Sequence, residues 1–298
     1  MMKDFLRRLS CVLTTVAALM IGVPAFASDV VYPGGGTLAQ VVDGGGTYSV
    51  VTLVNLDTVA IPYNLYFYSD GGTPLTLSTT LGTNSFFSGV LPVGGSVIIH
   101  TNGTSNTISQ GYAVVTSTSL NCYGYGTGDG SCQIAGSTVF GITLGSQVLE
   151  ASCPLDTGID SIIAIPFDST TANTGLAIAN SLGDNAYQYI GKGDTASLAI
   201  AFYDQSGNNF YSTSMQLATG QHTAFVLASQ FPQTVGKTGI MVITALDQSA
   251  TAVSTCGTGG CPYYVKALGL RVNLAGTTYT SVTPIIPCNY NSTYGCTN

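Results

Sequence analysis

Apolar and polar residues alternate along most of the chain, and short runs rich in glycine, asparagine, serine and aspartate interrupt the alternation. A period of two is typical of β-strands that bury one face and expose the other. After residue 27, no segment of ten or more residues has the apolar spacing of a helix, and only residues 224–231 predict a short helical turn. The pattern therefore predicts an all-β protein.

One strand–turn–strand pattern occurs twice in the sequence. The first copy is Leu65–Leu75 (LYFYSDGGTPL), and the second is Ala199–Phe210 (AIAFYDQSGNNF). Each copy runs from alternating apolar residues into an aromatic pair and then into a glycine-containing turn, which is the pattern of a β-hairpin. In the first copy, the expected arms of the hairpin are residues 64–69 and 75–79.

The segments around the two hairpins also match each other, in the same order along the chain. One example is Gly111–Thr116 (GYAVVT), which matches Gly239–Thr244 (GIMVIT). Each copy contains about seven expected strands with frequent turn signals, which is typical of a sandwich or barrel. We therefore expect two tandem antiparallel β-sandwich domains. The other matched segments are 38–43 with 162–168, the strand ending at Asn55 with 175–180, 91–98 with 215–225, and 138–144 with 266–272.

The expected domains are a signal peptide (1–27), a first sandwich (28–155), a second sandwich (156–287) and a C-terminal tail closed by a disulfide (288–298). Each unit of about 120 residues is long enough to bury its own core. Both sandwiches are expected to be Ig-like in architecture only, because the chain has no tryptophan to pack beside a disulfide as in immunoglobulin domains.

The first 27 residues have the features of a secretory signal peptide. Lys3, Arg7 and Arg8 form a basic start, an apolar run from 9 to 23 follows, and Ala25–Ala27 supplies small residues at the expected cleavage site. The run is shorter than the roughly 20 residues that span a bilayer, and no second long apolar run follows. We expect cleavage after Ala27, secretion, and no membrane insertion of the mature chain.

The chain has few charges, and most of them are acidic. Charged residues make up 7% of the sequence, against about 25% in typical soluble domains. The net charge is −7, and it becomes −9 when residues 1–27, with three basic residues and one acidic residue, are removed. The remaining four cations cannot form the basic patch that nucleic acid or anionic lipid requires. The composition is typical of exported β-proteins with hydroxyl-rich surfaces.

Seven cysteines follow residue 27, and six of them form three near-neighbour pairs. We expect three disulfides, because exported proteins meet oxidising conditions and each pair closes a loop rich in glycine, asparagine or tyrosine. A zinc site is the weaker alternative, since the chain has two histidines and no C-x-x-C motif. Cys153 is left over, and we interpret it as a buried strand cysteine, with an intermolecular bridge as the alternative. The expected pairs are Cys122–Cys132, Cys256–Cys261 and Cys288–Cys296.

Several runs of the chain resemble segments of uncharacterised exported bacterial proteins that are common in soil Acidobacteria. The resemblance covers nearly all of the mature chain and implies tandem β-sandwich units in an exported protein. It departs from that pattern at the cysteine-containing loops and near Tyr187 and Tyr189, and it implies no activity. The similar runs are Ser161–Asp168 (SIIAIPFD), Thr174–Asn180 (TGLAIAN), Phe202–Asp204 (FYD) and Gly220–Phe225 (GQHTAF).

Candidate catalytic chemistry is sparse in the sequence. The two histidines, His100 and His222, fall in different units, and we interpret each as a residue near a turn that hydrogen-bonds to the backbone. The motifs G-x-S-x-G, H-E-x-x-H and Walker A do not occur. We therefore expect no catalytic residue, no metal and no cofactor.

The acidic residues leave alternatives open. Glu150 is the only glutamate after residue 27, so a glycosidase-type pair of carboxylates would need an aspartate. Asp156, Asp160 and Asp168 fall where the two units join, which allows a calcium ion or an Asp-based hydrolase site. We interpret them instead as solvated linker acids.

Tyrosines in loops are the remaining candidates for ligand contacts. Exposed tyrosine offers a large contact area at low entropy cost, which sugars or protein partners can use. The alternative is that these rings cap the ends of their own sandwiches. The candidate contacts are Tyr123, Tyr125, Tyr187, Tyr189, Tyr263 and Tyr264.

The sequence therefore predicts an exported, non-catalytic structural or adhesive protein of the cell surface or extracellular matrix. Its expected partner is a protein or glycan bound through loops at the ends of the sandwiches. Self-assembly through pairing of edge strands is a further expectation. The alternatives are a pair of carbohydrate-binding modules and, after that, an Asp-based hydrolase at the domain junction.

Overall fold

The computed structural model describes residues 35–117, 134–156, 162–181, 195–247, 265–273, 278–285, 289–291 and 295–297. We refer to the described residues between 35 and 156 as the N-terminal half, and to those between 162 and 285 as the C-terminal half. The expected signal peptide (1–27) lies outside the described residues and stays a prediction, as do the expected domain boundaries.

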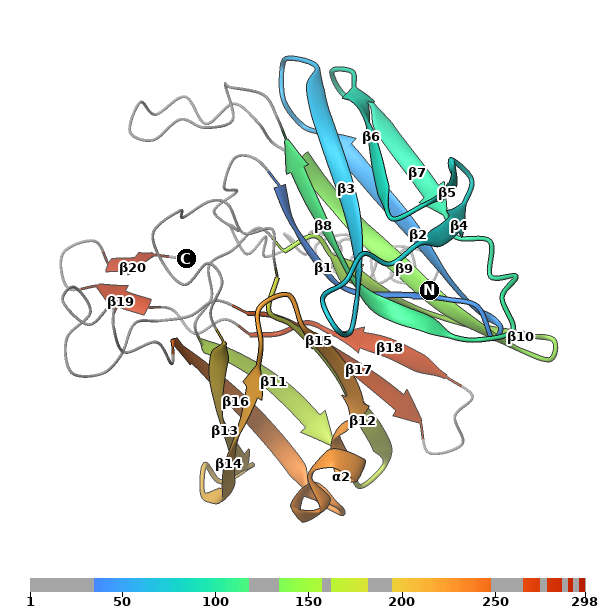
Figure 1. Cartoon of the computed structure of the whole chain (residues 1–298). Helices are drawn as coiled ribbons and strands as arrows, with labels where there is room; N and C mark the ends of the chain where they lie inside the picture. Colours follow the sequence, from blue (N-terminus) through green and yellow to red (C-terminus); the bar gives the residue numbers. More distant parts are fainter. Residues whose placement is uncertain are drawn as a thin grey trace, which may run out of the picture.

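Two four-stranded antiparallel sheets form the N-terminal half, drawn in blue to green in Figure 1. One sheet has the strand order β1-β8-β3-β6, and the other has the order β10-β9-β2-β7. A small hairpin, β4–β5, is inserted between β3 and β6. The strands are β1 (Gly35–Asp43), β2 (Thr47–Asn55), β3 (Ile61–Ser69), β4 (Leu77–Thr79), β5 (Gly82–Asn84), β6 (Phe86–Leu91), β7 (Ser96–His100), β8 (Ser109–Ser117), β9 (Ile134–Leu144) and β10 (Gln147–Pro154).

Two further four-stranded antiparallel sheets form the C-terminal half, with strand orders β11-β16-β13-β14 and β15-β12-β17-β18. One helical turn, α2 (Leu227–Gln230), falls within the predicted segment 224–231, and the 3-10 turn η2 (Pro232–Thr234) follows it. The strands are β11 (Ile162–Asp168), β12 (Ala172–Ala179), β13 (Ala196–Asp204), β14 (Asn209–Leu217), β15 (His222–Val226), β16 (Thr238–Asp247), β17 (Lys266–Asn273) and β18 (Tyr279–Val282), with a separate pair of β19 (Asn289–Asn291) and β20 (Gly295–Thr297).

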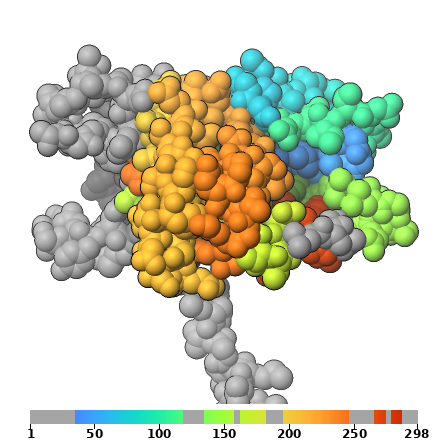
Figure 2. Space-filling model, turned by 90° about the horizontal axis from the view of Figure 1, so that it is seen from below, coloured from blue at the N-terminus to red at the C-terminus, as the bar shows by residue number. Residues whose placement is uncertain are grey.

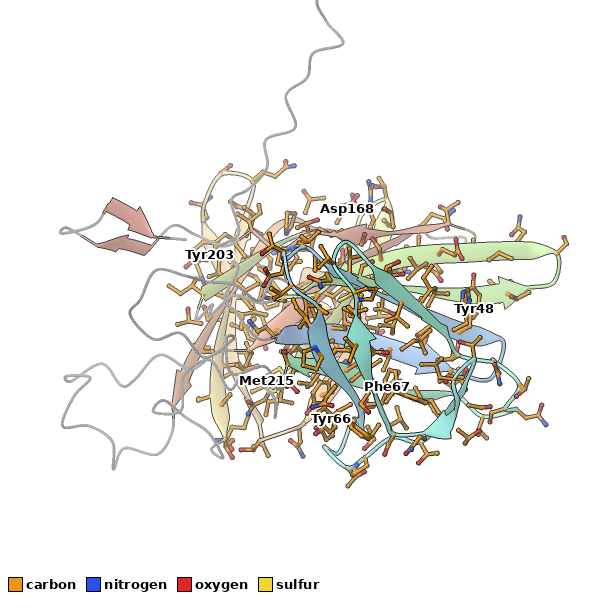
Figure 3. All side chains as sticks on the ribbon, turned by 90° about the horizontal axis from the view of Figure 1, so that it is seen from above. Tyr48, Tyr66, Phe67, Asp168, Tyr203 and Met215 are labelled. Atoms are coloured by element: carbon orange, nitrogen blue, oxygen red, sulfur yellow. The ribbon has the colours of Figure 1, made fainter. Side chains whose placement is uncertain are left out.

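Each half buries a core between its two sheets. In the N-terminal half, Leu53 of β2 and Phe67 of β3 come from different sheets and belong to one cluster, and Figure 3 labels Phe67. In the C-terminal half, Ile178 of β12 and Phe202 of β13 meet in the same way. The predicted all-β, sandwich-like class is therefore confirmed. The strand order differs from that of immunoglobulin domains, in which the first strand lies beside the second, because β1 lies beside β8.

The two halves have the same strand order in both sheets, and backbone details fix which positions correspond. Gly111 on β8 and Gly239 on β16 are equivalent: a Cβ atom at these positions would lie 1.8 Å from the carbonyl oxygen of Tyr68 and 1.9 Å from that of Tyr203, respectively. No side chain fits so close to a backbone oxygen, so both positions require glycine. The structure thus pairs the segments that the sequence match of 111–116 with 239–244 predicted.

Other backbone contacts extend this correspondence to the second sheet of each half. Asn55 ends β2 and Asn180 directly follows the equivalent strand β12. Each donates its side-chain amide to the carbonyl of the leucine that ends β6 or β14. Because the paired strands continue without a bulge from these asparagines, counting along them assigns an equivalent to each residue of β9, β10, β17 and β18. Isolated bridges at equivalent places are Thr37–Asp156 and Ala164–Ile285.

The prediction for the first hairpin is wrong in its second arm. The expected partner of residues 64–69 was 75–79, but β3 pairs with β6 and β8. Only the start of the expected arm follows β3, where the amide of Leu75 donates to the carbonyl of Phe67. The chain then turns away into β4–β5, and it returns at Ser85, whose carbonyl accepts from the amide of Phe67. The second hairpin, β13–β14, forms as predicted.

Candidate functional site

The two halves pack directly against each other, and Figure 2 shows yellow-to-orange atoms of the C-terminal half adjoining blue-to-green atoms of the N-terminal half. One apolar cluster joins β1, β9 and β10 to the outer face of β12 and β17. A second joins β8 to the end of β12 through Tyr112, Val114 and Ala179. Buried apolar contact of this kind opposes the relative motion that polar domain interfaces allow. The first cluster consists of Ala39, Phe140, Ala151, Cys153, Ala177 and Leu268.

A buried ion pair lies at this junction. The ammonium group of Lys266, whose side chain is 0% exposed, lies 3.1 Å from the carboxylate of Asp156. Asp156 is also held by its backbone, because its amide and carbonyl both bond to Thr37 of β1 at 2.9 Å. A buried charge is tolerated only with an opposite charge or hydrogen-bond partners. The pair therefore fixes β17 of the C-terminal half against the end of the N-terminal half.

A second polar contact joins the turn after β3 to β15. The Nδ1 atom of buried His222 lies 2.7 Å from the carboxylate of Asp70, and the side-chain amide of Gln110 donates to the same carboxylate at 2.7 Å. The ring of His222 stacks on Tyr112, with centroids 6.2 Å apart. Partial burial acts to raise the pKa of Asp70, but the hydrogen bonds from His222 and Gln110 outweigh it, so the pKa is lowered.

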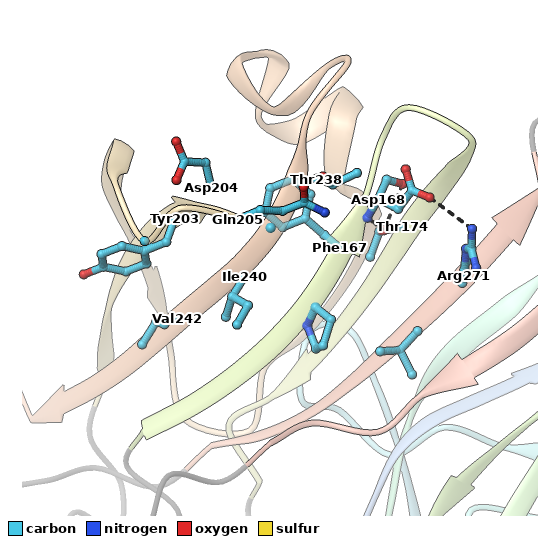
Figure 4. Close-up of a pocket in the computed structure, with 14 residues that line it drawn as sticks. Phe167, Asp168, Thr174, Tyr203, Asp204, Gln205, Thr238, Ile240, Val242 and Arg271 are labelled. Carbon is cyan, nitrogen blue, oxygen red and sulfur yellow. Dashed lines mark hydrogen bonds and ion pairs between the residues drawn. The ribbon is translucent and has the colours of Figure 1, made fainter.

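A groove of about 780 Å³ lies on the outer face of the sheet that contains β11, β16 and β13. In Figure 4, Tyr203 lies at one end, Asp168 and Arg271 lie at the other, and Ile240 lies between them. Ile240 is 40% exposed, so the floor of the groove is apolar and open to solvent. We take this groove as the candidate binding site, because it combines apolar area with a few fixed polar groups.

Hydrogen bonds hold Asp168 in a fixed position at the end of the groove. Its carboxylate accepts from the amides and hydroxyls of Thr170 and Thr171, and the guanidinium of Arg271 lies 3.0 Å away. The hydroxyl and amide of Thr171, followed by those of Thr170, lower the pKa of Asp168 below the ordinary aspartate range. Asp168 is therefore an ionised, bonded carboxylate that anchors Arg271.

The structure does not bring Asp156 and Asp168 together, as the alternatives of a calcium ion or an Asp-based hydrolase at the junction would need. Their cationic partners, Lys266 and Arg271, are five residues apart on β17, which is roughly 16 Å of strand, and they point to opposite faces of the sheet. A glycosidase pair is at most about 9.5 Å apart. Asp156 is also not a solvated linker acid, because it pairs with a buried lysine. Asp160 lies outside the described residues.

The two histidines have different surroundings. His100 is exposed at the end of β7. The ring of His222 does not bond to backbone as the sequence interpretation expected, because its Nδ1 atom pairs with the carboxylate of Asp70 in the other half of the molecule. Only its main-chain amide donates to a backbone carbonyl, that of Asp70. The available signal was weak: a histidine and a lysine, His222 and Lys266, are the first residues of otherwise mostly apolar strands.

Most of the other predicted site residues lie outside the described residues. This applies to the candidate contacts Tyr123, Tyr125, Tyr187, Tyr189, Tyr263 and Tyr264, and to Cys122, Cys132, Cys256, Cys261 and Cys288. For the last expected disulfide, the structure gives only the backbone of Cys296, which pairs with Tyr290. These predictions stay untested.

Cys153 has the surroundings that the sequence interpretation gave it. It lies on β10, buried in the cluster between the halves. Burial raises the pKa of its thiol to about 12. A thiol that stays protonated and shielded from solvent is a poor nucleophile, so Cys153 is a packing residue.

Comparisons with known proteins give no relative: no family model, no curated protein and no solved structure matches this chain. Among the described residues, no helix is long and apolar enough to cross a membrane, and no group of three or more histidines, cysteines or acids could hold a metal ion. Function must therefore be argued from the junction and the groove.

Proposed function

We propose that this protein is an exported, non-catalytic structural or adhesive protein of the cell surface or extracellular matrix, built from two tandem antiparallel β-sandwich domains. The observation that carries the proposal is the rigid junction. Two apolar clusters, the Lys266–Asp156 ion pair and the contact of His222 with Asp70 fix one sandwich against the other. Domains that need only a tether are joined by flexible linkers and polar interfaces, whereas a fixed angle suits a load-bearing or spacing element.

The exposed surface also supports this proposal. Many exposed strand positions carry serine, threonine or asparagine, as on the edge strand β14 (NFYSTSMQL). Such side chains hydrogen-bond to water and to neutral partners without depending on charge. With 7% charged residues in the whole chain, contacts made by these hydroxyl and amide groups are expected to be insensitive to salt.

The experiment that tests the proposal combines location with phenotype. Protease treatment of intact cells and N-terminal sequencing of the protein are expected to show an accessible chain that begins at Ser28. A strain without the protein is expected to lose cell adhesion or matrix integrity, and Asp156→Ala, which weakens the junction, is expected to restore it only in part. The matched control, Val235→Ala, changes an exposed residue outside both the junction and the groove and is expected to restore it fully. Full-length protein inside the cell would contradict the proposal.

A further inference from the structure

The groove lies on a surface of the C-terminal half that has an equivalent in the N-terminal half. In the N-terminal half, the equivalent surface is covered by the other sandwich. Tyr112 and Val114 of β8 are buried under the C-terminal half. Their equivalents on β16 are Ile240 and Val242, which line the open groove. The fold therefore contains the same docking face twice, once occupied and once open.

The opposite surface also occurs twice. The C-terminal half docks through the outer face of β12, β15, β17 and β18. In the N-terminal half, the equivalent outer face of β2, β7 and β9 is partly exposed, and the edge strand β10 both exposes Glu150 and contacts β18 through Ser152 and Ser281. This face and its rim expose apolar residues: Leu56 is 58% exposed, and Ile98 is exposed as well. Each molecule thus has one unfilled docking face and one unused complementary face.

We propose that the groove binds the N-terminal half of a second copy of this chain, head to tail, by repeating the contact that already joins the two halves. This inference deepens the proposed structural function, because it names the partner. The evidence comes from the contacts at the internal junction, each made by one residue from each half. For each contact, we compare the two equivalent residues, one at the groove and one on the complementary face. At every contact compared, the two open positions match each other in chemical character.

The buried ion pair gives the first comparison. At the junction, Asp156 pairs with Lys266. The position equivalent to Asp156 is Ile285, which is exposed, and the position equivalent to Lys266 is Ala135. A charge on one side alone would be left buried and unpaired on docking. Both positions are instead apolar, so an ion pair is replaced by an apolar pair.

The histidine contact gives the second comparison. At the junction, Asp70 meets His222. The turn that follows β13 has the same hydrogen bonds as the turn that follows β3, which makes Gln205 the equivalent of Asp70. The equivalent of His222 is Ser96, since both begin the edge strand beside the equivalent strands β2 and β12. Two charged or titratable groups are replaced by two neutral groups that can hydrogen-bond to each other.

A hydroxyl contact gives the third comparison. At the junction, the hydroxyl of Thr37 donates to that of Ser181 at 2.7 Å. The equivalents are Ala164 on β11 and Leu56, which directly follows Asn55 as Ser181 follows Asn180. A polar group on one side alone would lose a hydrogen bond on docking. Again both positions change together, here from polar to apolar.

An aromatic contact gives the fourth comparison and the clearest one. At the junction, Phe140 of β9 stacks on Tyr279 of β18, with centroids 6.4 Å apart. The equivalent of Phe140 is Arg271, in the groove, and the equivalent of Tyr279 is Glu150, which is exposed on β10. After residue 27, these are the only arginine and the only glutamate of the chain. Docking of a second copy would bring Arg271 and Glu150 together, so an ion pair would take the place that the aromatic pair has at the internal junction.

In a head-to-tail contact, the groove of one copy binds the complementary face of another, so the pair still has one free groove and one free complementary face. Each added copy leaves one groove and one complementary face open, so the assembly grows until it closes as a ring or continues as a filament. This distinguishes the proposal from a two-fold dimer, which would stop at two copies. It also fits a matrix or surface role, in which many copies form one layer or fibre.

Blocking each face separately tests the proposal. The purified protein is expected to show a mass in sedimentation that rises with concentration beyond a dimer. Ile240→Asp, which blocks the groove, and Leu56→Asp, which blocks the complementary face, are each expected to weaken association at least about tenfold, since central contacts carry most interface energy. An equimolar mixture of the two variants is expected to form a one-to-one complex and nothing larger, because only one intact pair of faces remains.

Val235→Asp is the matched control, since Val235 is 62% exposed and does not line the groove; it is expected to associate as the wild type does. Circular dichroism and thermal unfolding check that the variants fold. A wild type that stays monomeric at the highest soluble concentration would overturn the proposal. So would association that neither variant weakens, or a wild-type monomer whose groove binds a soluble glycan. An exported but monomeric protein would leave the proposed function standing and remove this inference alone.

Discussion

Each half has a docking face at the equivalent place in its fold. The face of the N-terminal half is covered, and the face of the C-terminal half is exposed. In the N-terminal half, Phe140 and Asp156 are covered by the C-terminal half and contact Tyr279 and Lys266. In the C-terminal half, the same backbone positions carry Arg271 and Ile285, and both are exposed. The backbone thus supplies two docking faces, and the side chains decide which of them must be covered for the chain to fold.

This comparison separates folding from assembly. The covered face carries groups that are unstable in isolation, above all the buried ammonium of Lys266. The open face carries groups that tolerate water, such as the bonded pair of Asp168 and Arg271. Substitutions at the covered face are therefore expected to unfold the protein, and substitutions at the open face are expected to change only its association.

The largest effect is expected from Asp156→Ala. Removing a carboxylate that offsets a fully buried lysine is expected to destabilise the protein by about 4 kcal/mol. At the equivalent position, Ile285→Ala is expected to cost less than about 1 kcal/mol, because the side chain is exposed. Urea unfolding measures both. The double variant Asp156→Leu with Lys266→Met is expected to recover most of the loss, and equal losses from the two single variants would show that the faces do not differ.

A somewhat smaller effect is expected from Phe140→Ala. Loss of a buried aromatic ring at the junction is expected to cost about 3 kcal/mol. Arg271→Ala, at the equivalent position, removes an exposed ion pair and is expected to cost less than about 1 kcal/mol. Thermal unfolding of the two variants gives the difference. If Arg271→Ala were as costly as Phe140→Ala, the groove would be part of the folded core and not an open face.

Equal effects are expected from Gly111→Ala and Gly239→Ala. In both variants the new methyl group would meet a carbonyl oxygen at less than 2 Å, and the backbone shift needed to relieve this is expected to cost about 2 kcal/mol. Denaturant unfolding checks whether the two losses agree. Gly145→Ala would not be a suitable control, because Gly145 has a positive φ. A loss at only one position would argue against the equivalence of the halves.

The smallest effect is expected in the pH dependence of folding stability, to which Asp70 contributes and the neutral Gln205 does not. The pKa of Asp70 is lowered in the folded protein. Its contribution to stability is therefore present above the pKa of an unfolded aspartate, about 3.9, and it is lost as the pH falls through the lower, folded value. Asp70→Asn is expected to flatten the stability profile below about pH 4, and Gln205→Asn is expected to leave it unchanged. Parallel profiles for wild type and Asp70→Asn would contradict this assignment.

The sequence pattern was sufficient for the strands and for much of their correspondence. Period-two alternation identified the strand of residues 111–116 and its counterpart 239–244, and the structure pairs them at the same glycine. The match of Asn55 with Asn180 also holds, because each side chain makes the same hydrogen bond. These features are local, and local periodicity and turn chemistry determine them.

The β4–β5 insertion and the junction between the halves could not be predicted, because they depend on contacts between residues that local sequence patterns do not relate. The β4–β5 insertion was missed because Pro74 and Leu75 continue the hairpin pattern for two residues before the chain turns away. The junction was missed because Asp70 and His222 are 152 residues apart. Which surface of a sandwich is covered depends on how the second sandwich docks, and no periodicity within either one encodes that.

In the proposed assembly, Glu150 of one copy meets Arg271 of another. The most direct measurement is the association constant of the charge-reversed variants Glu150→Arg and Arg271→Glu, each alone and in an equimolar mixture. Each variant alone is expected to associate at least about tenfold more weakly, because like charges face each other. The mixture is expected to regain the wild-type association, because each contact again joins opposite charges. A mixture that associates as weakly as the single variants would contradict the claim.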